Sequence, residues 1–174
     1  MGALKLRGDP ESFQLEAGGA RRIFVNVADA RVVQVLDRGT GNTLAEWPLP
    51  EGLGGNFPMA LDEAGGTLFV GVRKPVALAC VLALSTDDGR VKARVPCAAD
   101  ADDLCFDAAR RRVYVVGGVG RVTVVDTVSF AVLGEIETAL GARTGFWYPE
   151  RDSLYVAAPA TASTPARLLV FHGD

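Results

Sequence analysis

A triplet made of an aliphatic residue, an aromatic residue and valine occurs four times in this chain. The aromatic members are Phe24, Phe69, Tyr114 and Tyr155, so the intervals between them are 45, 45 and 41 residues. A period of about 40–50 residues is the length of one four-stranded blade of a β-propeller. The repeat therefore predicts an all-β chain built from four similar units.

The composition agrees with this prediction and excludes several kinds of partner. Of the 174 residues, 49% are hydrophobic, and 20 glycines separate short runs rich in Val, Leu, Phe and Thr. The net charge of −3 provides no basic surface for nucleic acid or for an anionic membrane. No apolar run reaches the ~20 residues that span a bilayer. We therefore expect no nucleic-acid partner and no membrane partner.

The N-terminus and the cysteines bear on the compartment. Residues 1–8 lack the apolar core of a secretory signal, so the expected localisation is cytoplasmic by default, and periplasmic if a signal was removed. The three cysteines, Cys80, Cys97 and Cys105, lack the CxxC spacing of zinc and redox sites. We expect free thiols, and a Cys97–Cys105 disulfide is the alternative.

Residues 1–174 form one predicted propeller domain. Each unit divides into four short strands, of which the first lies innermost in a propeller. Units 1 to 3 occupy residues 9–54, 55–98 and 99–141. The fourth unit, residues 142–174, supplies three strands, at 145–148, 153–157 and 167–171, and no fourth strand.

Residues 3–7 alternate apolar and cationic side chains, which is the pattern of a half-buried edge strand. This strand brings the total to that of four complete blades. We therefore expect residues 1–8 to complete the last blade and to remove its open edge. A disordered tail is the alternative.

Several segments resemble the YVTN-type, YncE-like β-propeller repeats. Residues 31–37, 41–45 and 121–126 look like the third strand, turn and fourth strand of that repeat, and residues 8–13 and 55–60 look like its start. The resemblance covers nearly the whole chain and implies a WD40-like propeller, but it implies no activity. Members of this family generally form seven blades from about twice this length, within the usual range for propellers.

Four units allow three forms of assembly. Two chains can close one ring of eight blades, one chain can close by itself on four, or the chain can be an open part of a larger parent. Because similar repeats usually build seven blades, the gentle turn per blade of an eight-bladed ring fits them better than the sharp turn of a four-bladed one. We expect a homodimer in which each N-terminal strand completes the last blade of its partner.

Polar side chains occur near the start of the first strand of every unit, which lies at the channel mouth of a propeller. The candidate ligand-binding residues are Glu11, Asn56, Asp102, Asp103 and Arg143. The expected ligand is a small molecule or a protein, and solvated turns without a ligand are the alternative. Arg143 either binds a ligand anion or neutralises the acidic run at residues 100–103, and we expect the second role.

Two tryptophans are assigned from strand alternation. Trp147 is expected to pack on one side of the fourth unit, with Phe146 and Tyr148 packed on the other side. Trp47 lies in a fourth strand, at the outside of its blade, and is expected to be partly exposed.

The sequence carries no catalytic motif. The single histidine, His172, has no triad spacing, and the GxSxG, P-loop and HExxH patterns are missing. The acidic run lacks the pattern of an EF-hand loop, so we expect no metal site and no cofactor. These features favour a non-enzymatic scaffold or binding module. The alternative is a hydrolase or lyase that uses the channel-mouth carboxylates and Arg143, with a divalent cation.

Overall fold

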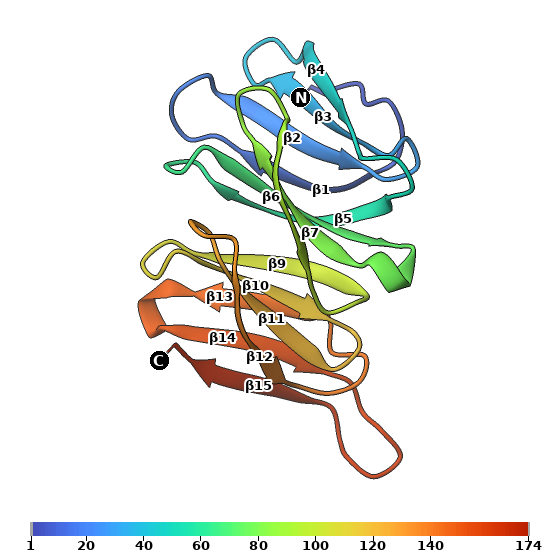
Figure 1. Ribbon diagram of the computed structural model, residues 1–174, viewed down its shortest axis with the longest axis vertical. Helices are drawn as coiled ribbons and strands as arrows, with labels where there is room; N and C mark the ends of the chain where they lie inside the picture. The colour runs from blue at the N-terminus through green and yellow to red at the C-terminus, as the bar shows by residue number, and fades with distance from the viewer. Residues whose placement is uncertain (1, 174) are drawn as a thin grey trace.

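The computed structural model describes residues 2–173. Within that range, fifteen strands form four antiparallel sheets, which stack in sequence order along the long axis of the molecule (Figure 1). Three of these sheets have four strands and the last has three. The chain is therefore all-β and propeller-like, and we call the sheets blades 1 to 4.

Strands follow one another within each blade in chain order. Blade 1 contains β1 (Pro10–Leu15), β2 (Arg22–Val27), β3 (Val32–Asp37) and β4 (Thr43–Pro48). Blade 2 contains β5 (Gly54–Asp62), β6 (Thr67–Lys74), β7 (Cys80–Ser85) and β8 (Val91–Pro96). Blade 3 contains β9 (Ala101–Asp107), β10 (Arg112–Gly117), β11 (Arg121–Asp126) and β12 (Val132–Glu137). Blade 4 contains β13 (Thr144–Tyr148), β14 (Ser153–Ala158) and β15 (Arg167–His172). Two short 3-10 turns, Val76–Leu78 and Pro149–Arg151, complete the described regular structure.

Neighbouring blades touch mainly through their first strands, since β1 contacts β5, β5 contacts β9, and β9 contacts β13. The first strands therefore line one side of the stack, and the fourth strands lie at its outer edge. This is the wedge-like arrangement of propeller blades around an axis.

The packing between blades explains the repeated triplet. The aromatic side chain points toward the following blade, and the two flanking aliphatic side chains point toward the preceding one, because alternate residues of a strand face opposite sides of a sheet. In blade 2, Phe69 belongs to the cluster shared with blade 3, whereas Leu68 and Val70 belong to the cluster shared with blade 1. Phe24 and Phe69 are fully buried. Tyr155 is only half-buried, because no described blade covers that side of blade 4.

Trp47 corrects a prediction, because it is 8% exposed rather than partly exposed. Its ring lies 5.6 Å from the ring of Phe24 and fits against Gly89 of blade 2, where a Cβ would collide with it. In the same way, Val95 of β8 packs in the core between blades 2 and 3, and Ile136 of β12 packs in the core between blades 3 and 4. Each fourth strand thus helps to cover the following blade.

Blade 4 corrects a second prediction. Trp147 is buried against Tyr114 of blade 3, with ring centroids 5.2 Å apart, as alternation predicts. Phe146 and Tyr148 on the other side are exposed, at 63% and 39%. They were expected to pack against a blade, but the described residues place none there.

Residues 3–7 are not a strand in this chain. They lie against the outward face of blade 1, where Leu6 packs with Val25, Val27, Val32 and Leu36. The backbone N–H of Arg7 donates to Oε1 of Gln34 at 3.0 Å instead of joining a ladder. Blade 4 lies at the opposite end of the stack, so its edge is out of reach of this segment (Figure 1). Completion of the last blade of a partner chain stays a prediction.

The buried aromatic of the triplet gives the first test. We expect Phe69→Ala to lower the free energy of unfolding by about 3–5 kcal/mol, because it opens a cavity between blades 2 and 3. Leu44→Ala, at a residue 55% exposed in β4, serves as the control and is expected to cost less than about 1 kcal/mol. Urea unfolding measures both. Equal losses in the two variants would contradict this account of the repeat.

Candidate functional site

A groove runs along the rim formed by the starts of the first strands. Its cavity volume is ≈ 460 Å³, and its lining comes from all four units: Glu11, Ser12, Phe57, Arg73, Asp102, Asp103 and Arg143. Four of the five candidate residues, Glu11, Asp102, Asp103 and Arg143, therefore lie together. The fifth, Asn56, does not line the groove.

Asn56 lies between blades 1 and 2 and is fully buried. Its Nδ2 donates to Oδ1 of Asn26 at 3.0 Å and to the carbonyl oxygen of Val32 at 2.9 Å. A buried amide with such partners holds two sheets together, because leaving these groups unpaired would cost free energy. The structure therefore gives Asn56 a packing position rather than a place at the rim.

Arg73 is the rim residue that sequence reasoning missed. It follows Val72 near the end of β6, and β6 runs antiparallel to β5, with Asn56 opposite Val72 and Gly54 opposite Lys74. The ends of second strands therefore reach the same rim as the starts of first strands. A search that included both positions in each unit would have found Arg73.

Two arginines and two aspartates form a closed network of ion pairs at the groove, and all of them except Asp100 line it. Arg73 bonds to both Asp100 and Asp102. Nη1 of Arg143 lies 2.8 Å from Oδ2 of Asp100, and its Nε lies 3.0 Å from Oδ2 of Asp102. The expectation that Arg143 neutralises the acidic run is confirmed. The four groups compensate one another, so their charges are not free for a ligand.

This network joins three units of the chain. Arg73 comes from blade 2, Asp100 and Asp102 from the start of blade 3, and Arg143 from the segment that leads into blade 4. The guanidinium of Arg73 also stacks on the ring of Phe57, with its Cζ 4.5 Å from the ring centroid, and its side chain is only 19% exposed. The network therefore fixes neighbouring blades relative to one another at the rim.

Asp103 has a different environment from its acidic neighbours. Its Oδ2 accepts a hydrogen bond from the backbone N–H of Gly145 at 2.8 Å, which links blades 3 and 4. Burial raises the pKa of Asp103, and the nearby Asp102 carboxylate adds to the rise. A carboxyl group with a raised pKa at a cavity can serve in acid–base chemistry, although no second titrating group bonds to it in the described residues.

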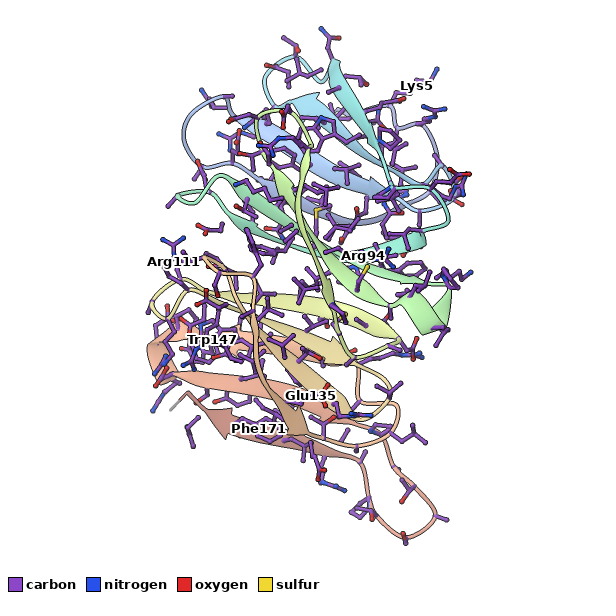
Figure 2. All side chains as sticks on the ribbon, in the orientation of Figure 1. Lys5, Arg94, Arg111, Glu135, Trp147 and Phe171 are labelled. Carbon is purple, nitrogen blue, oxygen red and sulfur yellow. The ribbon has the colours of Figure 1, made fainter. Side chains whose placement is uncertain are left out.

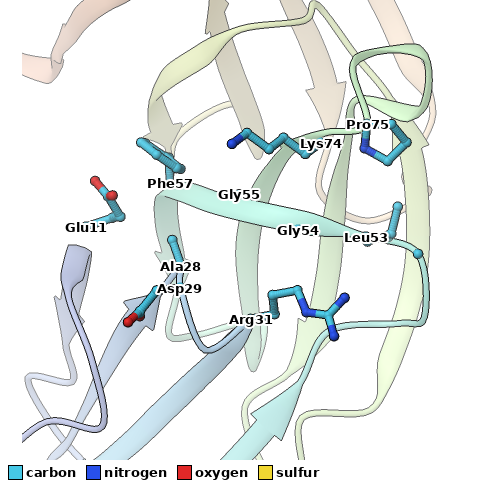
Figure 3. Close-up of a pocket in the computed structure, with 11 residues that line it drawn as sticks. Glu11, Ala28, Asp29, Arg31, Leu53, Gly54, Gly55, Phe57, Lys74 and Pro75 are labelled. Atoms are coloured by element: carbon cyan, nitrogen blue, oxygen red, sulfur yellow. The ribbon is translucent and has the colours of Figure 1, made fainter.

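A second cavity of ≈ 550 Å³ opens beside the groove and shares Glu11 and Phe57 with it (Figure 3). The side chains of Arg31 and Lys74 cross Gly54 and Gly55, where an added Cβ would approach either stem to 3.4 Å. The amine of Lys74 points toward Phe57, whereas the guanidinium of Arg31 points away from it (Figure 3). Glu11 and Asp29 line the same cavity, so this part of the rim presents both cationic and acidic groups.

The cysteines take no part in the ion pairs of the rim network. All three are free thiols, and burial raises the pKa of Cys97 and Cys105 to about 12. Both groups are therefore protonated at neutral pH and are poor nucleophiles.

Residues 2–173 contain neither a cluster of metal ligands nor a membrane-spanning helix. No three side chains of the types His, Cys, Asp and Glu are grouped so that they can hold a metal ion. Nor does this range contain a helix with the length and apolar character needed to cross a membrane.

Two solved structures share the architecture. Hydrazine synthase from Kuenenia stuttgartiensis superposes with a TM-score of 0.81 over 99% of this chain and 48% of that chain, at 14% sequence identity. Sqt1 from Saccharomyces cerevisiae gives a TM-score of 0.68 over 97% of this chain and 47% of that chain, at 11% identity. This chain thus spans about half the length of each of them. At such identities the likeness concerns the fold alone.

The sequence comparisons assign no family. No protein-family model matches the chain, and no curated protein matches it in sequence. The resemblance to YVTN-type, YncE-like repeats accordingly stays a prediction.

The ion-pair network gives a test at the rim. We expect Arg73→Ala to lower the free energy of unfolding by about 1–3 kcal/mol, because two half-buried carboxylates lose a partner. The control is Arg121→Ala, which removes an exposed pair with Glu135 and is expected to cost less than about 1 kcal/mol. Chemical unfolding at low salt measures both. A loss for Arg73→Ala no larger than that of the control would show that the network does not fix the blades.

Asp103 gives a test by pH. Because its pKa is raised in the folded state, the ionised carboxylate destabilises the fold once the pH exceeds the ordinary aspartate value of 3.8, and the cost is complete above the raised pKa. Asparagine keeps an acceptor for Gly145 and never ionises. We expect Asp103→Asn to match the wild-type melting temperature near pH 3 and to exceed it near pH 7. A variant that is less stable at pH 7 would contradict this assignment.

Proposed function

We propose that this chain is a non-enzymatic scaffold: half of a β-propeller ring that closes with a second copy and presents a binding surface at its rim. In this proposal four blades from each of two chains make one ring of eight. We also propose, from the resemblance of its repeats, that the chain is a divergent relative of the YVTN-type, YncE-like propellers.

The observation that carries the proposal is the uncovered face at each end of the stack. Blade 4 exposes Phe146, Tyr148, Leu168 and Val170 on one face, at 63%, 39%, 59% and 45%. Blade 1 exposes Phe13 and Leu15 of its first strand, at 60% and 49%. Contiguous exposed apolar residues of this kind mark interaction surfaces.

A second copy is the occupant that fits both faces. Within the chain, the same kind of face is covered at every internal junction by the neighbouring blade, as with Phe69 toward blade 3 and Tyr114 toward blade 4. A face of blade 4 packed on blade 1 of another chain repeats that junction. Each buried Å² of apolar surface contributes about 25 cal/mol, and a two-fold arrangement makes the junction twice.

The geometry favours the scaffold over the hydrolase or lyase that the sequence left as the alternative. Asp100 and Asp102 are bound by two arginines each, and Arg143 is used in holding them. Charged groups compensated in this way are poor acid–base catalysts, and Asp103, whose pKa is raised, has no second titrating group bonded to it among the described residues. The rim is therefore proposed to bind rather than to transform a small molecule or a protein.

The test of this proposal is the mass in solution. We expect sedimentation at micromolar concentration to give twice the chain mass, and the melting temperature to rise with protein concentration. Phe146→Asp places a charge in the proposed junction and is expected to give monomer. Leu140→Asp, on a loop residue 78% exposed, is the matched control and is expected to leave the dimer intact. A wild-type monomer across this range would overturn the proposal.

A further inference from the structure

The outer edge of β15 has no strand beside it among the described residues. In the other three blades the third strand pairs with a fourth: β3 with β4, β7 with β8, and β11 with β12. In blade 4, β15 pairs with β14 alone. An unpaired strand edge is a template for strand addition, because its N–H and C=O groups lack backbone partners.

The segment of residues 3–7 already lies where a fourth strand of a preceding blade would lie. Trp47, Val95 and Ile136 of the fourth strands pack into the core of the following blade. Leu6 packs into the core on the outward face of blade 1 in the same way. Residues 3–7 therefore cover blade 1 as the fourth strand of a preceding blade would.

The contacts and the chain connection agree. Leu4 also packs on blade 1, because it fills the space in front of Gly41 in the turn between β3 and β4. The segment then leads through Gly8 and Asp9 directly into β1, as each fourth strand leads into the first strand of the following blade.

The free edge that this segment could complete is not its own. Lys5 lies beside blade 1 at one end of the molecule, and Phe171 of β15 lies at the other end (Figure 2). A second copy of this chain offers the same edge without that separation.

We infer that residues 3–7 pair antiparallel with β15 of a second copy and complete its blade 4. This inference rests on the proposed dimer, whose junction sets blade 4 of one copy on the outward face of blade 1 of the other. The segment keeps Leu6 on its own blade 1 while its backbone joins the partner's β15. Such strand addition gives affinity through main-chain hydrogen bonds.

The repeat predicts the register of the pairing. In blades 1 to 3 the second residue of the third strand pairs with the fourth-strand residue that enters the following core: Val33 with Trp47, Val81 with Val95, and Val122 with Ile136. The corresponding residue of β15 is Leu168, so it should face Leu6. Two residues along, Val170 should face Leu4. The side chains of both pairs then lie on the exposed face of blade 4.

The test is a disulfide between positions that only this register brings together. We expect the double variant Leu4→Cys, Val170→Cys to form a covalent dimer on mild oxidation, because opposite residues of paired strands have Cβ atoms about 4.5–5.5 Å apart. The control is Leu4→Cys, Phe146→Cys, which places the second thiol on the same face but in the first strand. It contains the same native cysteines and should give little covalent dimer. Non-reducing electrophoresis and native mass spectrometry read the result.

The outcomes separate this inference from the proposed function. A covalent dimer in the first variant and not in the control supports the strand addition. A dimeric mass with equal or no cross-linking in both variants would overturn the strand addition and leave the proposed dimer standing. A disulfide between positions 4 and 170 within one chain would show that the segment pairs with β15 of its own chain. That result would overturn the strand addition between copies. A monomeric mass without cross-linking would remove both proposals.

Discussion

Burial of both faces of every sheet is the constraint on which this structure depends. The triplet builds it locally, since an aromatic side chain points forward and two aliphatic side chains point backward along the stack, as Phe69, Leu68 and Val70 do in blade 2. Both faces of a blade made this way are apolar. Stacking therefore continues until the ring closes, or it leaves an apolar face at each end, and this chain leaves both ends uncovered in part.

The two ends are covered to different degrees. On blade 1, Leu6 shields the outward face of β2 and β3, and only the first strand leaves Phe13 and Leu15 exposed. Within residues 2–173 no segment covers blade 4 in this way, and Tyr155, its triplet aromatic, is half-buried where its counterparts are buried. Residues 3–7 cover blade 1, and β15 of blade 4 has a free edge that a strand can join. The proposed dimer and the proposed strand addition therefore use the same junction.

The rim follows from the same stacking. Antiparallel first and second strands bring Arg73, Asp102 and Arg143 from three units to one place, where they compensate one another's charge. The network is therefore best understood as part of the junctions between blades. The cavity beside it carries both signs of charge, since Arg31 and Lys74 line it together with Glu11 and Asp29. A binding role for the rim depends more on that cavity than on the acidic run, whose charge the two arginines compensate.

The sequence by itself determined the strand content, the number of units and the three-stranded last unit, because a period of about 45 residues and the alternation within each strand are local properties of the chain. It also placed Glu11, Asp102, Asp103 and Arg143 at one rim, since equivalent positions of a repeat share one place in the fold. Tertiary structure decided the rest. Asn56 turned inward to Asn26, Trp47 was covered by the next blade, and Arg73 entered the rim from a second strand. The position of residues 3–7 also depended on which sheet edge lay within reach. These outcomes depend on contacts between units that are distant in the chain, and no local pattern encodes them.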